Sequence, residues 1–210
     1  MQDGTKISTP RRRGRPRSFE PDAALDRALD AFWTGGYTGT SLDDLSAATG
    51  MNRPSLYAAF GDKRQIYLTV LGRFAQMMEA AVGAAMTDAR TLAEALARFY
   101  GGALDVYLSG DEGARGCFVI CTAAVDAPQE PLIRDALQAV LALIDERLAA
   151  RIRQAVEAGE LPADTDVDTL GALAAATLHS LAVRARAGTP RVALEALAEA
   201  SIAQLLRAAH

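Results

Sequence analysis

Apolar residues recur at intervals of three and four along most of the chain, and this spacing constrains the possible folds more than any other feature of the sequence. In the stretch that follows Pro21, apolar side chains stand at Leu25, Ala28, Leu29, Phe32 and Trp33. Such a pattern gives a helix one apolar face, which must be buried against other helices. Half of the 210 residues are hydrophobic but only 6% are aromatic, and β-branched residues are scarce. The sequence therefore predicts an all-α fold with almost no sheet.

Glycine, proline and helix-capping residues divide this pattern into about nine helices. The predicted helices begin near Pro21, Ser41, Asn52, Asp62, Thr91, Cys117, Pro131, Val167 and Pro190. The first is expected to end at Gly35 and Gly36, and the fourth to continue to about Met86 as a link between domains.

The first three predicted helices have the lengths and the turn of a DNA-binding unit. Gly50 ends one short helix, and after Met51 the next begins at Asn52, a good N-cap. Two short helices joined by a tight turn, with a longer amphipathic helix before them, describe a helix-turn-helix. We therefore expect a helix-turn-helix domain over residues 19–65 and a larger helical domain over residues 66–210.

Charge is distributed unevenly, which matters because the net charge of −4 by itself argues weakly against DNA binding. Residues 1–65 carry a net charge of +2 and residues 66–210 a net charge of −6. Residues 1–18 are polar and basic, with almost no apolar residues, which predicts a flexible basic arm. Its segment Arg13–Arg17 resembles the AT-hook, so Arg15 and Arg17 are expected to follow the minor groove; a solubilising tail is the alternative.

The N-terminal part of the chain contains an almost continuous series of characteristic residues: Gly14-Arg15-Pro16-Arg17, Ala24-Leu25, Ala31-Phe32-Trp33, Gly36-Tyr37, Thr40 to Leu45, Ala48-Thr49-Gly50, Ser55-Leu56-Tyr57 and Phe60 to Lys63. This series resembles the N-terminal signature of the TetR family of regulators. It implies a regulator that uses its last two helices to form a four-helix homodimer interface, and residues 66–210 as a ligand-binding and dimerisation domain. The small residues Gly171, Ala172, Ala174, Ala175 and Ala176 agree with a close helix approach there, and ordinary core packing within one subunit is the alternative.

The candidate DNA-binding residues lie around the predicted recognition helix. Its leading residues Asn52, Arg53, Pro54 and Ser55 are expected to enter the major groove. Arg53 can donate to guanine O6 and N7, and Asn52 can pair with adenine unless it is occupied as a helix cap. Side chains suited to phosphate oxygens are those of Thr40, Ser41, Tyr57 and Lys63, and for the last two the resemblance implies that role.

The candidate effector site is a group of apolar and sulfur-containing side chains in the larger domain. We expect a small-molecule effector, of a kind that the sequence does not identify, among Phe74, Phe99, Tyr100, Cys117, Cys121 and the helix that starts at Pro131. The two cysteines are interpreted as small buried hydrophobes. In a competing interpretation they sense electrophiles or oxidants, with Arg115 lowering the pKa of Cys117.

Several classes of protein are not expected. No apolar run is long enough to span a membrane and no secretory signal is visible, which predicts a cytoplasmic protein without a membrane partner. His179 has no second ligand at helical spacing, so no metal site is predicted, and no cofactor or enzyme motif is present. The sequence predicts a ligand-responsive repressor that binds a palindromic operator as a homodimer. The alternatives are a thiol-based regulator and a non-specific architectural DNA-binding protein.

Overall fold

The computed structural model describes residues 20–87, 89–110 and 113–208, and throughout these ranges the regular structure is helical. The helices are α1 (Pro21–Gly39), α2 (Leu42–Thr49), α3 (Arg53–Phe60), α4 (Lys63–Thr87), α5 (Leu92–Tyr107), α6 (Ala124–Asp126), α7 (Pro131–Glu157), α8 (Val167–Arg186) and α9 (Arg191–Ala208), with a π-helical turn at Val119–Ala123. The predicted all-α fold is confirmed.

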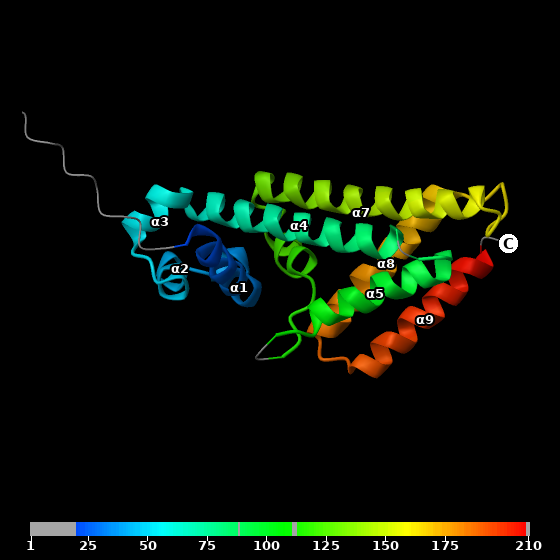
Figure 1. Ribbon diagram of the computed structural model, residues 1–210. Coiled ribbons are helices and arrows are strands. Elements are labelled where there is room, and N and C mark those ends of the chain that lie inside the picture. The colour runs from blue at the N-terminus through cyan, green and yellow to red at the C-terminus, as the bar shows by residue number, and fades with distance from the viewer. Residues whose placement is uncertain (1–19, 88, 111–112, 209–210) are drawn as a thin grey trace, which may run out of the picture.

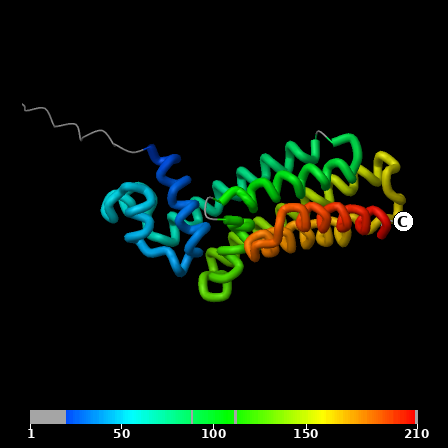
Figure 2. Tube along the Cα trace, turned by 90° about the horizontal axis from the view of Figure 1, so that it is seen from below, coloured from blue at the N-terminus to red at the C-terminus, as the bar shows by residue number. Residues whose placement is uncertain are grey.

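The molecule is elongated, with α1, α2 and α3 gathered at one end (Figure 1). Helix α4 leaves this end and runs beside α7 along the molecule, with α5 on its other side, while α8 packs against α7 and α5, and α9 against α5 and α8. Figure 2, seen from below, also shows α8 and α9 side by side, far from α2 and α3. The three N-terminal helices meet the rest of the molecule through α4 and the π-helical turn, and Arg186 at the end of α8 donates to the Trp33 carbonyl at 3.3 Å.

Helix α1 differs from its predicted extent. The backbone leaves the helical conformation at Gly36, with φ 70° and ψ 175°, but a further helical turn continues to Gly39. Positive φ favours glycine, which explains the break. A side chain at Gly35 would also collide with Thr40, because its Cβ would lie 2.6 Å from the Thr40 hydroxyl oxygen. The two glycines thus bend the chain and let it fold back closely onto α1.

Local capping sets the positions of α2 and α3. Ser41 and Asp44 form a capping box: the Ser41 hydroxyl accepts from the Asp44 backbone N–H, and the Asp44 carboxylate accepts from the Ser41 backbone N–H. Gly50 ends α2 in the left-handed conformation, with φ 69°. The Asn52 side chain then accepts from the Ser55 N–H at 2.9 Å and starts α3. This is the predicted helix-turn-helix arrangement.

Aromatic side chains join the N-terminal helices to the rest of the molecule. Phe32 packs edge-on against Tyr67 of α4 at 5.1 Å between ring centroids, and Trp33 against Phe74 at 5.0 Å. Phe118, just before the π-helical turn, contacts the rings of Trp33, Tyr67 and Phe74. Because α4 takes part in both regions, the predicted division after residue 65 falls within a continuous helix.

Candidate DNA interface and effector cavity

The exposed face of α3 carries the residues expected to meet DNA. Arg53, Pro54 and Tyr57 are exposed, and Ser55 is half-buried. The guanidinium of Arg53 donates two hydrogen bonds to Asp43 of α2, from Nε to Oδ1 at 2.8 Å and from Nη2 to Oδ2 at 2.5 Å. This bidentate pair occupies one edge of the guanidinium and leaves the other donors facing outward.

Two residues flanking these helices depart from their expected roles. Thr40 is 3% exposed and its hydroxyl donates to the Gly36 carbonyl at 2.7 Å, which argues against a phosphate contact by this side chain. The side-chain oxygen of Asn52 is occupied by the α3 cap, so only its amide N–H groups remain for DNA. Both side chains satisfy local backbone groups, which stabilises the turn geometry.

The remaining candidates at this end differ in how firmly their donors are held. Ser41 is exposed, although its hydroxyl donates to Asp44 at 2.7 Å. The Lys63 ammonium lies 4.6 Å from the centre of the Tyr37 ring and has one long contact with the Thr38 carbonyl, at 3.5 Å. Phosphate can replace such weak contacts. Arg15 and Arg17 lie outside the described residues.

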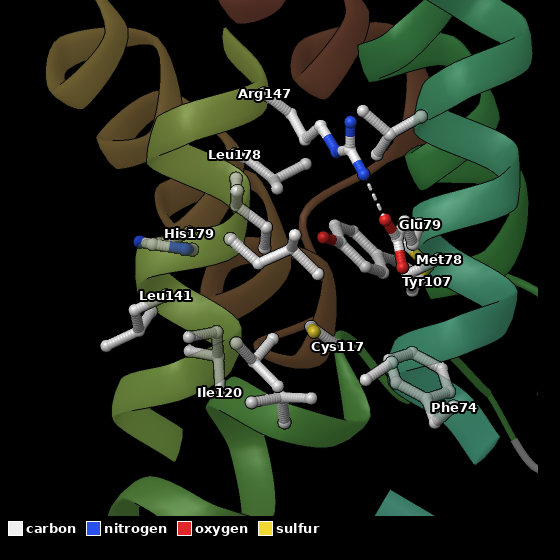
Figure 3. A pocket seen from close by; sticks show the side chains of 16 residues that line it. Phe74, Met78, Glu79, Tyr107, Cys117, Ile120, Leu141, Arg147, Leu178 and His179 are labelled. Carbon is white, nitrogen blue, oxygen red and sulfur yellow. Dashed lines mark hydrogen bonds and ion pairs between the residues drawn. The ribbon is translucent and has the colours of Figure 1, made fainter. Parts of the chain in front are cut away.

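A narrow apolar cavity lies between α4, α5, α7, α8 and the segment that starts at Cys117 (Figure 3). Its apolar wall comes mainly from Phe74, Met78, Val82, Val119, Ile144 and Leu178. The cavity is small, because the volume open to the centre of a water molecule is only about 20 Å³. One polar pair, Glu79 of α4 and Arg147 of α7, joins the two long helices beside the cavity.

The cavity includes part of the predicted effector site and omits the rest. Phe74 and Cys117 line it, whereas Phe99, Tyr100 and Cys121 do not. Phe99 and Tyr100 pack against each other, 5.5 Å between centroids, in the core of α5, and the Tyr100 hydroxyl donates to the Ala174 carbonyl. The helix from Pro131, which is α7, lines the cavity as expected, whereas sequence reasoning missed Tyr107 and Leu178. Helical spacing from Phe74 could have found Met78 and Val82, which follow one and two turns later.

Comparisons with known proteins match both regions. Residues 24–70 match the family model "Bacterial regulatory proteins, tetR family", and residues 93–201 match "Tetracyclin repressor-like, C-terminal domain". The HTH-type transcriptional repressor ComR of Escherichia coli is 33% identical over 177 residues, which cover 84% of each chain. The chain belongs to the TetR family.

A solved TetR-family structure gives the same fold with DNA bound. A cysteine mutant of the regulator CifR, complexed with 26-bp double-strand operator DNA, is 34% identical and has a TM-score of 0.84. The match covers 90% of this chain and 98% of CifR. The predicted class, a DNA-binding transcriptional regulator of the TetR family, is confirmed. Its relatives are named as regulators and not as enzymes.

The surface of α8 and α9 is the dimer interface that the resemblance to the TetR family implies. On these helices Leu173, Val183 and Val192 are 50%, 55% and 74% exposed. They lie among exposed alanines, at positions 172, 176, 196, 200 and 203. The other small residues of the predicted stripe, Gly171, Ala174 and Ala175, are buried within the subunit. A Cβ at Gly171 would lie 3.0 Å from the Ala149 nitrogen, so Gly171 serves the packing of α8 on α7.

The cysteines of this TetR-family protein do not have the environment of reactive thiols. Burial raises the pKa of Cys117 to about 11 and also raises that of Cys121, although Arg186 acts in the opposite direction on Cys121. The expectation that Arg115 lowers the pKa of Cys117 is wrong. Arg115 instead pairs with Asp30 at 2.6 Å and lies over the Trp33 ring at 4.5 Å. The geometry therefore argues against the thiol-sensing alternative.

The described residues contain neither a metal-binding cluster nor a membrane-spanning helix. Among residues 20–87, 89–110 and 113–208 there is no group of three or more His, Cys, Asp or Glu residues that could hold a metal ion. Within the same ranges, no helix combines the length and the apolar character needed to cross a membrane. His179 lines the cavity from α8, and burial lowers its pKa against the opposing effect of Asp145.

Proposed function

We propose that the protein is a repressor that binds a palindromic operator as a homodimer and is released by a small molecule. Residues 1–18 act as a basic arm, residues 19–65 as the DNA-binding domain and residues 66–210 as the effector-binding and dimerisation domain. It acts on DNA in the cytoplasm and has no catalytic step of its own. The observation that carries this proposal is the continuity of α4, which joins the DNA-binding helices to the cavity.

Helix α4 contacts both regions through neighbouring turns. Tyr67 of α4 packs against Phe32 of α1. Arg73 of α4 pairs with Asp22 and Asp26, which also belong to α1. Further on, Phe74 contacts Trp33 and also lines the cavity, followed there by Met78. A molecule that enlarges the narrow cavity must move some of these side chains, and α4 transmits that movement to α1.

The proposed DNA interface divides into base-reading and phosphate-binding residues. Arg53 reads guanine in the major groove, with Pro54 and Ser55 beside it at the start of α3. Ser41, Tyr57 and Lys63 contact phosphates, as Arg15 and Arg17 do from the arm. The exposed hydroxyl of Tyr57 and the weakly held ammonium of Lys63 support these roles. Asn52 serves mainly as the cap of α3.

The spacing of the two recognition helices is the proposed switch. A dimer formed through the exposed apolar face of α8 and α9 places two copies of α3 on one duplex. Both can bind only if the half-sites are about 34–36 Å apart, or a multiple of that distance. A tilt of α4 changes this spacing. An effector that prefers the DNA-incompetent form by about 100-fold contributes about 2.7 kcal/mol of coupling.

The test combines operator selection with equilibrium measurements. Duplexes selected from a random pool by the full-length protein should contain a palindrome, and sedimentation should show a dimer at micromolar concentration. Compounds that raise the melting temperature should bind more weakly when the selected operator is saturating, by the factor with which they weaken DNA binding. Equal compound affinities with and without operator, or a monomer that binds single half-sites, would contradict the proposal.

A further inference from the structure

Two tyrosines on the same helix differ in one respect that points to a ligand. Tyr100 and Tyr107 lie two turns apart on α5, and both are 0% exposed. The Tyr100 hydroxyl donates to the Ala174 carbonyl at 2.9 Å. The Tyr107 hydroxyl has no oxygen or nitrogen hydrogen-bond partner among the described residues, and its polar neighbour is the Cys117 thiol, which is only a weak donor and acceptor. An unpaired buried hydroxyl is costly, so its retention requires an explanation.

The direction of the Tyr107 side chain suggests that explanation. Tyr107 lines the cavity, and Figure 3 shows its hydroxyl pointing between α4 and α7 into the space enclosed by the apolar side chains. Burial raises the pKa of Tyr107 well above its usual value, and burial also keeps the neighbouring Cys117 protonated by raising its pKa to about 11. At neutral pH the phenol therefore presents an O–H donor to whatever occupies the cavity.

The two charged side chains of the cavity wall neutralise each other, so neither is available as a counter-ion for a charged ligand. Glu79 and Arg147 are the two ionic residues of the wall, and they pair with each other at a partly exposed position between α4 and α7. His179 lies on the opposite side of the view from Tyr107 in Figure 3, and burial lowers its pKa, which favours the neutral imidazole. A charged ligand would lose its hydration without gaining a counter-ion.

From this geometry we infer that the effector is an uncharged, largely apolar molecule with a hydrogen-bond acceptor that receives the proton of the Tyr107 hydroxyl. The inference rests on the proposed function, because it names the chemistry of the effector of that same cavity. The acceptor gives the orientation of the molecule and the apolar wall gives most of the binding energy, as in most small-molecule sites. An aromatic or aliphatic ketone, aldehyde, ester or ether has this chemistry.

Three probes of nearly identical shape test the chemistry: acetophenone carries one acceptor, α-methylstyrene replaces the carbonyl oxygen by a methylene, and benzoate carries a charge. Their dissociation constants are measured by calorimetry for the full-length wild-type protein, for Tyr107→Phe and for the matched control Tyr100→Phe. The ratio of the acetophenone and α-methylstyrene affinities is compared between proteins, because this comparison cancels the different hydration of the two probes.

The hydrogen bond predicts that this ratio favours acetophenone about tenfold more in the wild type than in Tyr107→Phe. Tyr100→Phe should keep the wild-type ratio, and benzoate should bind at least tenfold more weakly than acetophenone. Tyr107→Phe should melt no lower than the wild type, whereas Tyr100→Phe should melt lower because it loses a satisfied hydrogen bond.

Each contrary result identifies what has failed. An unchanged ratio in Tyr107→Phe, or a melting temperature lowered as much as in Tyr100→Phe, shows that the hydroxyl already has a partner and overturns the inference. Preferred binding of benzoate overturns the uncharged class. In both cases the proposed function still holds if at least one probe binds and if saturating operator DNA weakens its binding. Absence of binding by all three probes at millimolar concentration removes the cavity as the effector site, and the inference falls with it.

Discussion

The pair between Arg53 and Asp43 leads to a specific prediction about base reading. A guanidinium has five N–H donors in a rigid plane. Asp43 accepts from Nε and from Nη2, which uses one edge of that plane. The end of the guanidinium, formed by Nη1 and the second hydrogen of Nη2, has the geometry for guanine O6 and N7. Asp43 is therefore a positioning residue that directs Arg53 toward the groove.

Two substitutions separate reading from positioning. Arg53→Ala should reduce the preference for guanine at one operator position by about 5- to 150-fold, the range of a bidentate base contact. Asp43→Asn should reduce the same preference, because an amide cannot accept two hydrogen bonds from the guanidinium as a carboxylate does. The affinity of Asp43→Asn for random duplex should stay equal or rise, because one negative charge near the phosphates is removed.

The assay is fluorescence anisotropy with the selected operator, the same operator with each base pair of one half-site replaced, and a random duplex, all at two salt concentrations. The double variant Asp43→Asn/Arg53→Ala completes a cycle, and in it the effect of Asp43→Asn on guanine preference should disappear. If Arg53→Ala weakens operator and random duplex equally, Arg53 is a phosphate contact. If Asp43→Asn strengthens operator binding with its guanine preference intact, Asp43 merely competes with DNA, and the positioning argument fails.

Three further predictions concern charge. Lys63→Ala should weaken operator and random duplex alike and reduce the salt slope by about one, and a loss confined to the operator would contradict its phosphate role. Deleting residues 1–13 and replacing Arg15 and Arg17 by alanine should lower affinity and flatten the salt dependence; an unchanged slope would show that the arm has no role in DNA binding. Burial lowers the pKa of His179 in the folded protein. Below the unfolded pKa of about 6.5, His179 therefore binds a proton more readily in the unfolded chain, and the folded state loses stability as the pH falls. His179→Gln should therefore lose less melting temperature between pH 7 and pH 5 than the wild type, and equal losses would exclude His179 as a cause.

Features that depend on neighbouring residues in the chain could be predicted from the sequence. The caps at Ser41, Asn52 and Thr91 each bond to a backbone N–H three residues later, so the same short segment contains both partners. The starts of α2, α3 and α5 follow directly from them. The helix-turn-helix consists of such local signals, which is why its outline and its family resemblance were both visible in the sequence.

Features that depend on packing between distant segments could not be predicted in the same way. Tyr100 and Tyr107 both belong to the apolar face of α5, and the sequence alone does not distinguish the one that bonds to α8 from the one that faces a cavity. Thr40 and Ser41 are likewise adjacent hydroxyl residues, but the bend at Gly36 buries only the first. In each pair the outcome depends on a contact with another part of the fold.

The narrow cavity also determines which wall yields to a ligand. Helices α7 and α8 approach so closely at Gly171 that a Cβ there would lie 3.0 Å from the Ala149 backbone, and such close packing resists separation. Across the cavity, the ion pair between Glu79 of α4 and Arg147 of α7 links these two helices. The pair is partly exposed, and exposed ion pairs contribute little stability. We therefore expect a ligand that enlarges the cavity to displace α4 more than it displaces α7 or α8. Because Phe74 of α4 contacts Trp33, the displacement reaches the helix that precedes the DNA-binding turn.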